Sequence, residues 1–308
     1  MKHANNTGTN GSPGKHVLGL RYALKRMLAR GELGEVWLAW DREREREVAL
    51  KFLPQSLLAD SSSLGKVRAE LELIFQLQHS AIASIYDFLH DSETVALGTE
   101  FVPGWSLAVL RLDRPQRRYS VEEVRPWAMQ VCAALEHAHG RGVVHGGLKQ
   151  ANLLLDIREQ IKVTDFGIGY RLRQALGRHR YPGASALPYL SPQQIEGAAP
   201  AVADDIYALG AVLYELLTGT PPFYTGNILK EIRQLPPPPM TGRLVQLDLE
   251  GVFPERWEQI VAACLAKDPA RRPTSAREVF LALELEPESD RGAESVSEQS
   301  DATSGSTS

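Results

Sequence analysis

The stretch that decides the fold is His145-Gly-Gly-Leu-Lys-Gln-Ala-Asn152-Leu-Leu-Leu155, which is followed along the chain by Asp165-Phe-Gly167. An asparagine amide and an aspartate carboxylate both supply hard oxygen ligands, which suit a Mg²⁺ ion that bridges phosphate oxygens. Asn152 and Asp165 fit that pair, although either residue alone could be an ordinary turn residue. Taken together, the two stretches predict a site for metal and phosphate.

Two segments nearer the N-terminus point to the same chemistry. Ala29-Arg-Gly31-Glu-Leu-Gly34-Glu-Val36 places glycines between two predicted strands, where backbone N–H groups can approach a phosphate closely because no Cβ intervenes. A glycine-bearing hairpin without a ligand is the commoner case. Val48-Ala-Leu-Lys51 ends an apolar strand on a lysine, which is costly to bury without an anionic partner. Phosphate and Glu70 would supply that partner; otherwise the ammonium reaches water at the strand edge.

The order of predicted elements gives an α+β fold with a small β-rich part followed by a large helical part. Compact apolar runs predict strands over residues 36–40, 48–53, 82–88 and 95–102, with a helix over 64–77 between the second and third. Pro103-Gly104 breaks the pattern. Amphipathic or apolar spacing then predicts helices over residues 121–141, 205–218, 255–266 and 275–285.

Composition bounds the class of protein. Hydrophobic residues make up 43% of the 308 residues, which excludes wholesale disorder, and the formal net charge of −4 gives no electrostatic case for a nucleic-acid partner. No apolar run approaches the roughly 18 residues that a membrane span needs, and the N-terminus does not read as a signal peptide. Cys132 and Cys264 are expected to be free core residues in a reducing cytoplasm, the predicted location.

These motifs, in this order, resemble the protein kinase family, above all the bacterial kinases of the eukaryotic Ser/Thr type, over about residues 20–285. The resemblance implies a bilobal fold, with a small lobe over 17–102 and a large lobe over 103–286. The polar composition of residues 1–16 predicts a disordered lead-in, and the near absence of apolar residues over 287–308 predicts a disordered acidic tail. The resemblance also implies ATP and Mg²⁺ as ligands. Lys51 and Glu70 match the family's strand lysine and helix glutamate, Lys149 and Asn152 match its catalytic-loop lysine and asparagine, and Asp165 matches its magnesium aspartate.

The resemblance also assigns the nucleotide-binding residues. Ala29, Gly31 and Gly34 would form the loop that covers the phosphates. Glu100 to Val102 would form the hinge that hydrogen-bonds the adenine, and Thr99 falls at the back of the pocket. The residues that would clasp the adenine ring are Val36, Ala49 and Leu154. These apolar residues would serve as core in any case.

The sequence departs from the family at the residue that handles the substrate hydroxyl. The family has an aspartate five residues before Asn152, where this chain has Gly147. That aspartate orients the hydroxyl and accepts its proton, a contribution that is typically about 10²–10⁴-fold in rate. Because phosphoryl transfer also depends on metal and positioning, the loss predicts a severe defect without forbidding residual turnover.

Further departures lie on the same side of the site. Gly146 replaces an arginine that would pair with a phosphorylated activation loop, Ala186 replaces a threonine, and Gln193 replaces a glutamate that pairs with the arginine at position 272. Ala29 replaces the first loop glycine. The segment over residues 168–194, which matches the family's activation segment, carries Arg171, Arg173, Arg178 and Arg180. These arginines fit either a solvated basic loop or a docking patch for an acidic partner.

Three functions remain open from the sequence. The first is a pseudokinase that binds ATP and Mg²⁺ and signals through an unidentified protein partner. The second is a weak Ser/Thr kinase that transfers the γ-phosphate of ATP to protein hydroxyls. The third is an enzyme that transfers another part of the nucleotide. The retained Lys51, Asn152 and Asp165 beside Gly147 favour the first.

Overall fold

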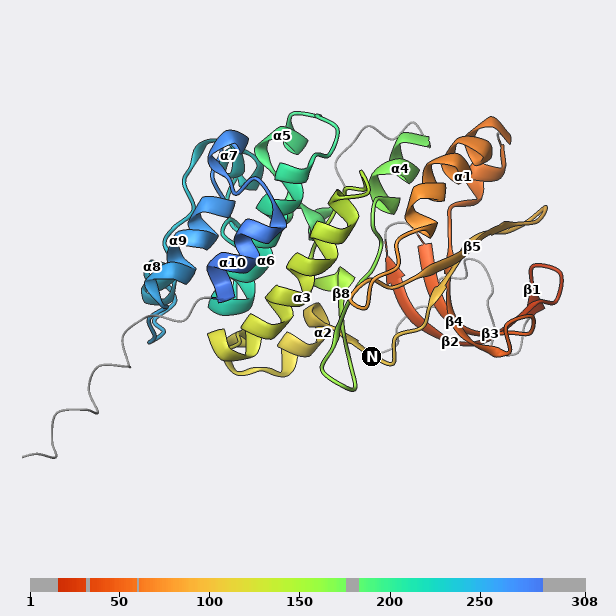
Figure 1. Ribbon diagram of the computed structural model, residues 1–308, viewed down its shortest axis with the longest axis horizontal. Coiled ribbons are helices and arrows are strands. Elements are labelled where there is room, and N and C mark those ends of the chain that lie inside the picture. The colour runs from red at the N-terminus through yellow and green to blue at the C-terminus, as the bar shows by residue number, and fades with distance from the viewer. Residues whose placement is uncertain (1–15, 32–33, 60, 176–182, 285–308) are drawn as a thin grey trace, which may run out of the picture.

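The structure is a computed structural model that describes residues 16–31, 34–59, 61–175 and 183–284. The side chains at positions 16, 59, 61–63, 70 and 175 lie outside that description. An antiparallel sheet covered by helix α1 forms one end of the molecule, and a helical body forms the other (Figure 1). This arrangement confirms the α+β fold with a β-rich N-terminal lobe and a helical C-terminal lobe.

The sheet of the small lobe has six strands in the order β1-β2-β3-β4-β6-β5. The bounds are β1 (His16–Val17), β2 (Tyr22–Gly31), β3 (Gly34–Asp41), β4 (Arg46–Phe52), β5 (Ile85–His90) and β6 (Val95–Glu100). The four predicted strands correspond to β3, β4, β5 and β6. The structure begins β5 three residues later than predicted and ends β6 at Glu100, because the chain from Phe101 onward leaves the ladder toward the large lobe.

The two faces of this sheet belong to different hydrophobic clusters. In β6, Val95 and Leu97 join the main core, whereas Ala96 between them packs with Val48 and Leu50 of β4 on the opposite face. This alternation follows from the two-residue period of a strand. Helix α1 (Ser61–Phe75) contributes its buried side chains to the main core, so it covers the same face as Val95 and Leu97.

The large lobe is built around α6 (Val202–Thr218), whose residues from Asp204 to Thr218 are all buried. A helix that is apolar around its circumference requires neighbours on every side. Helices α3 (Val121–His139) and α9 (Glu255–Cys264) pack against it, and α10 (Ala276–Glu284) packs on both of those. The four predicted helices are therefore confirmed, with ends that shift by up to three residues.

The remaining helical elements of the large lobe are short. They are α2 (Leu107–Leu110), α4 (Ile168–Ala175), α5 (Pro192–Ile195), α7 (Ile228–Gln234) and α8 (Met240–Gln246). The one-turn 3₁₀ segments of the chain are η1 (Gln55–Ala59), η2 (Arg111–Asp113), η3 (Pro115–Arg117), η4 (Gln150–Asn152), η5 (Ala184–Tyr189) and η6 (Pro269–Arg271). Helix α4 lies beside α1, where the two lobes meet (Figure 1).

A second, three-stranded sheet in the large lobe was not predicted. It has the order β7-β8-β9, with β7 (Gly104–Ser106), β8 (Leu153–Asp156) and β9 (Ile161–Val163). Strands of three or four residues carry too little periodic signal to be read from the sequence, and β7 begins inside the Pro-Gly break. This sheet positions the site, because Asn152 immediately precedes β8 and Asp165 closely follows β9.

The two cysteines are free core residues, as the sequence predicted. Cys132 and Cys264 are free thiols with exposed fractions of 1% and 0%. Burial raises the pKa of both thiols above the ordinary value, so neither is a reactive cysteine. Among the described residues, no helix combines the length and the apolar content needed to cross a bilayer.

Candidate functional site

The two lobes are joined by an ion pair between Lys51 and Asp165. The Lys51 ammonium at the end of β4 lies 2.7 Å from the Asp165 carboxylate, and the side chains are 11% and 31% exposed. Burial alone would raise the pKa of Asp165, but the charge of Lys51 and its hydrogen bond outweigh burial and hold the pKa below the ordinary value. Asp165 is therefore ionised at neutral pH, and the lysine has the anionic partner that its burial requires.

Asn152 and Asp165 are brought together by the β8–β9 ladder. Leu153 pairs with Val163, and the next backbone N–H along, that of Thr164, donates to the Asn152 carbonyl at 2.9 Å. The residue after Thr164 is Asp165. One short hairpin thus brings together the two residues that the sequence predicted as metal ligands.

Asp165 has a backbone φ of +66°, a left-handed conformation that non-glycine residues rarely adopt. The surrounding packing holds it there. Phe166 is 2% exposed, and its ring centroid lies 4.7 Å from that of the buried His145. Gly167 also has a positive φ, and its N–H donates to the His145 carbonyl at 2.9 Å. Such held, uncommon backbone conformations concentrate at functional sites.

The donor set at this hairpin fits Mg²⁺. The Asn152 amide nitrogen donates to the Gly147 carbonyl at 3.0 Å, which leaves its amide oxygen as the acceptor that a cation could use. Within the part of the chain that the structure describes, no three His, Cys, Asp or Glu side chains gather into a metal cage. One amide and one carboxylate are nevertheless what a Mg²⁺ ion takes from a protein when substrate phosphates complete its coordination.

The predicted adenine-binding residues lie on neighbouring strands of the small lobe and on β8 of the large lobe. Val36 of β3 pairs with Lys51, and Ala49 of β4 pairs with Thr99 of β6. The Thr99 hydroxyl donates to the Ala49 carbonyl at 3.2 Å, so this side chain is fixed against β4. Leu154 lies in β8, between Ser106 and Lys162 in the ladder.

Within the predicted hinge, the side chain of Glu100 is already engaged by other residues of the protein. Its carboxylate forms an ion pair with Lys162 at 2.7 Å and accepts the Ser84 N–H at 3.1 Å. Because both oxygens are engaged inside the protein, any contribution of Glu100 to a ligand comes from its backbone. Val102 is 6% exposed. The hinge is therefore held to the large lobe through Lys162 of β9.

The predicted phosphate loop falls where β2 ends and β3 begins. Ala29 pairs with Val36 and Gly31 pairs with Gly34, and residues 32–33 between them lie outside the described residues. Gly34 has a φ of +137°, and a Cβ there would fall 2.0 Å from the Phe52 carbonyl oxygen. No other residue can occupy position 34 with this backbone.

Glu70 belongs to α1, but its side chain lies outside the described residues. The pairing of Glu70 with Lys51, which the resemblance implies, stays a prediction. Helix α1 lies within the small lobe and contributes Leu71 and Ile74, close to Glu70 in sequence, to the main core.

A buried carboxylate fixes the backbone of the catalytic loop. Asp205 on α6 accepts the N–H of His145 at 2.7 Å and the N–H of Gly146 at 2.8 Å, and it contacts His139 Nε2 at 2.8 Å. Its side chain is 1% exposed. The sequence places Asp205 only at the start of the predicted helix over residues 205–218. The signal that could have found its role is a carboxylate inside an apolar helix, which must meet donors if it is buried.

The two glycines of the catalytic loop differ in their surroundings. Gly146 has a φ of +68°, and a Cβ there would lie 3.1 Å from the Pro200 side chain. Gly147 is exposed, its φ is not in the left-handed region, and a Cβ would meet nothing within 4 Å. The fold therefore has room for a side chain at position 147, while position 146 favours glycine in this conformation.

Lys149 lies close to the segment that precedes α5. Its ammonium approaches the Ser185 hydroxyl at 3.5 Å. The family's threonine hydroxyl in this segment is missing because position 186 is the buried Ala186. Ser185 supplies a hydroxyl one residue earlier, a contact that the sequence did not predict because it depends on the path of η5.

The end of this segment is fastened to the large lobe through an amide. The Arg272 guanidinium donates to the Gln193 amide oxygen at 2.6 Å, and the Gln193 amide nitrogen donates to the Lys267 carbonyl at 3.0 Å. As predicted, Arg272 makes a hydrogen bond to a neutral amide at position 193 instead of an ion pair with a glutamate. The Arg272 guanidinium also lies 3.7 Å from the carboxylate of Asp204, at the start of α6.

Comparison with known proteins agrees with this geometry. The protein kinase domain model matches residues 22–282. PrkC, a Ser/Thr protein kinase of Bacillus subtilis, is 32% identical over 90% of this chain and 42% of its own length. PkaB, a Ser/Thr protein kinase of Streptomyces coelicolor, is 35% identical over 83% of this chain and 60% of its own length. The chain thus spans about half the length of these curated relatives.

A solved structure shows the same fold. The crystal structure of the Mycobacterium tuberculosis PknI kinase domain superposes with a TM-score of 0.69 at 27% identity, covering 88% of this chain and 98% of that one. The matched region contains both the Lys51–Asp165 pair and the loop at Gly147. The chain belongs to the protein kinase family, among the eukaryotic-type Ser/Thr kinases of bacteria.

Proposed function

We propose that this chain is a pseudokinase: a module that binds ATP with Mg²⁺ and signals or scaffolds through its shape. The observation that carries the proposal is the Lys51–Asp165 ion pair at 2.7 Å, assembled beside Asn152 and next to a loop with glycine at position 147. Lys51, Asn152 and Asp165, which would handle the nucleotide, are all retained, whereas the side chain that would activate the substrate hydroxyl is absent at position 147.

The roles of the chain's own residues follow from charge and reach. Lys51 is a cation already partly removed from water, so it can hold phosphate oxygens in place of the Asp165 carboxylate. Asn152 and Asp165 would hold the Mg²⁺, whose charge offsets that of the phosphates. Val36, Ala49 and Leu154 provide apolar surface from both lobes for an adenine ring. The backbone around Gly31 and Gly34 would cover the phosphates.

Thermal unfolding in the presence of ATP and Mg²⁺ tests this proposal. A ligand at 100 times its Kd stabilises the folded state by about 2.7 kcal/mol, so wild type should show a clear rise in Tm. Lys51→Ala should lose that rise. Lys66→Ala, which changes an exposed lysine on α1, is the matched control and should keep it. No rise in wild type, or an equal rise in Lys51→Ala, would refute nucleotide binding at this site.

A second candidate function is a weak Ser/Thr kinase. The observation that favours it is the retained Lys149, which lies near the Ser185 hydroxyl. Ser185 belongs to residues 183–195, which include η5 and α5 and are here called the substrate-facing segment. Phosphoryl transfer through a loose transition state depends chiefly on positioning and charge, so some turnover without a carboxylate base is physically reasonable. This function predicts slow transfer of labelled γ-phosphate that disappears in Asp165→Ala. Zero transfer to generic substrates and to the protein itself would exclude it.

A further inference from the structure

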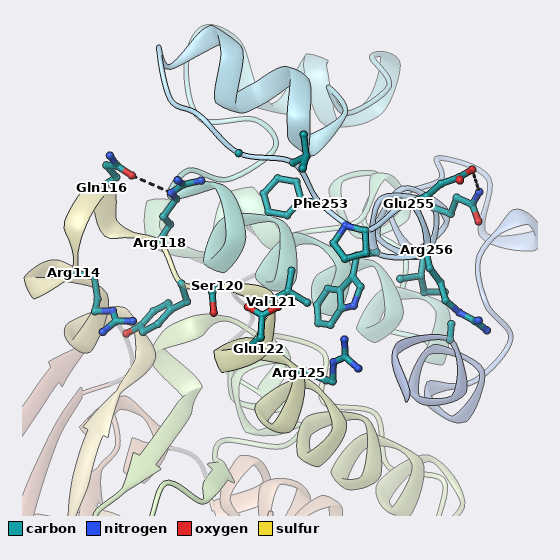
Figure 2. A pocket seen from close by; sticks show the side chains of 18 of the residues that line it. Arg114, Gln116, Arg118, Ser120, Val121, Glu122, Arg125, Phe253, Glu255 and Arg256 are labelled. Atoms are coloured by element: carbon teal, nitrogen blue, oxygen red, sulfur yellow. Dashed lines mark hydrogen bonds between the residues drawn. The ribbon is translucent and has the colours of Figure 1, made fainter. Parts of the chain in front are cut away.

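A large groove opens on the helical lobe, and none of the predicted nucleotide-binding residues lines it. It runs between the start of α3, the preceding loop and the segment that enters α9 (Figure 2). Its volume is about 1550 Å³, larger than the roughly 300–1,000 Å³ typical of small-molecule pockets. Phe253 and the buried Trp257 contribute aromatic surface to it. This size and lining suit a segment of polypeptide.

The groove is positively charged. Four arginines and two glutamates line it. Figure 2 shows Arg118 and Arg256 on opposite sides of Phe253. The Arg118 guanidinium donates to the Gln116 amide oxygen and to the Glu250 carbonyl, both at 3.0 Å, and both acceptors are neutral. Among the described residues, Arg256 has no carboxylate partner. Two uncompensated cations therefore flank an aromatic surface.

The chain itself carries the complementary charge. Residues 285–308, which lie outside the described part, contain six carboxylates and a single arginine, a net charge of −5. The whole chain has a net charge of −4, so residues 1–284 together carry a net charge of +1. All of the net negative charge is thus concentrated in the last 24 residues.

This acidic segment begins at the edge of the groove. Ala282 of α10 is one of the groove-lining residues, and α10 ends at Glu284, two residues later. A segment tethered so closely has an effective concentration in the millimolar range, so contacts that are individually weak can hold it. Glu286, Glu288 and Asp290 are the first acidic residues after α10.

We propose that residues 286–301 dock in cis into this groove, with their carboxylates on Arg118 and Arg256. The docked segment covers Phe253 and ties the C-terminal end of the chain to the start of α3. This interaction is independent of nucleotide binding. It requires no change in the helical lobe, because the groove is already present.

Paramagnetic relaxation enhancement on the full chain tests the proposal. A nitroxide is attached at Ser295→Cys, which is selective because Cys132 and Cys264 are buried. The expected result is loss of amide signal from residues 251–257 and 118–125, with the β-sheet lobe unaffected. About 1 M NaCl should restore the signals, because it shortens the Debye length to about 3 Å from about 10 Å at 0.1 M.

Charge-reversal variants sharpen the test. The double variant Arg118→Glu, Arg256→Glu should abolish the signal loss, whereas Arg271→Glu, at an exposed arginine outside the groove, should preserve it. Equal signal loss in both variants, or no localised loss in wild type, overturns the proposal. So does signal loss that appears when isotope-labelled chain without nitroxide is mixed with nitroxide-labelled chain, because the groove would then hold the segment of a second copy.

Discussion

Lys51 and the partly buried Lys267 mark the difference between the two sides of the site, the nucleotide side and the side where the substrate-facing segment meets the large lobe. Lys51, on the nucleotide side, has a carboxylate 2.7 Å away. Lys267, where the substrate-facing segment is fastened, has no hydrogen-bond partner for its ammonium among the described residues and lies 4.3 Å from the centroid of the Phe223 ring. Burial lowers the pKa of Lys267 to about 8. Lys51 thus has a compensating carboxylate where ATP is expected, whereas the Lys267 ammonium, where the segment meets the large lobe, packs on an aromatic ring instead.

The comparison extends to neighbouring side chains. On the nucleotide side, the Asp165 carboxylate contacts Lys51, and Asn152 is tied by its backbone carbonyl to Thr164, the residue before Asp165. On the other side, position 147 has no side chain and position 193 presents an amide to Arg272. Asn152 of the nucleotide side and Gly147 of the other side lie on one loop, and Asp205 holds the start of that loop. The losses are therefore chemical and local, and they leave the fold intact.

The largest expected effect comes from restoring a carboxylate at position 147. Gly147→Asp meets no steric obstacle, because a Cβ there has nothing within 4 Å. A positioned general base typically contributes about 10²–10⁴-fold, so transfer of labelled phosphate should rise by at least the lower figure. Gly147→Asn is the matched control, since it adds the same volume without a base. Equal rates for the two variants would show that the missing base does not explain the difference between the two sides.

The next largest effect is on stability and tests the shared scaffold. Asp205→Ala removes the acceptor of two buried backbone N–H groups and of the His139 contact. Leaving such groups unsatisfied should lower the free energy of unfolding by about 3 kcal/mol, measured by denaturant titration. Asp113→Ala, at an exposed aspartate, should change it by less than about 0.5 kcal/mol. A small effect at Asp205 would mean that other contacts hold the loop.

A smaller effect follows from adding a carboxylate at position 193. Gln193→Glu would place an anion opposite the buried Arg272 guanidinium, which now donates to the amide at 2.6 Å. The lost amide bond to the Lys267 carbonyl is partly replaced, because Arg272 already donates to that carbonyl at 3.1 Å. We expect about 1–2 kcal/mol of added stability at pH 7. Gln194→Glu is the neighbouring control, and equal gains in both would argue against the pairing.

The smallest expected effect is at Lys267 and depends on pH. Because burial lowers the pKa of Lys267 to about 8, its ammonium destabilises the fold below that pH, and the cost disappears above the ordinary lysine pKa of about 10.5. Lys267→Met keeps an unbranched apolar side chain on Phe223. After allowance for solvent screening, it should add about 1 kcal/mol at pH 7 and almost nothing at pH 10.5. A gain that does not change with pH would contradict the assignment.

The sequence predicted much of the architecture, since long periodic segments such as α3 and α6 are legible from their own apolar spacing. It also predicted that Lys51, Asn152 and Asp165 belong together. It could not predict β7 to β9, because strands of three or four residues are shorter than the window in which periodicity shows. Yet that small sheet is what brings Asn152 beside Asp165.

Three features of the site depend on contacts between distant segments. The room at Gly147 and the tight space at Gly146 come from the path of the loop past Pro200. The Ser185 hydroxyl reaches Lys149 only because η5 folds back toward the catalytic loop. No local pattern encodes these distances. They decide, however, whether a lost side chain could be restored.

The most direct test of the selective loss is calorimetric titration of ATP into wild type and Gly147→Asp, each with and without Mg²⁺. The two chains should bind ATP with Mg²⁺ at the same Kd within a factor of about two, and Asp165→Asn should lose the Mg²⁺-dependent part of the affinity. Equal affinities would show that the nucleotide side is complete without the base. Wild type that binds no ATP, or that binds it only after Gly147→Asp, would contradict the account.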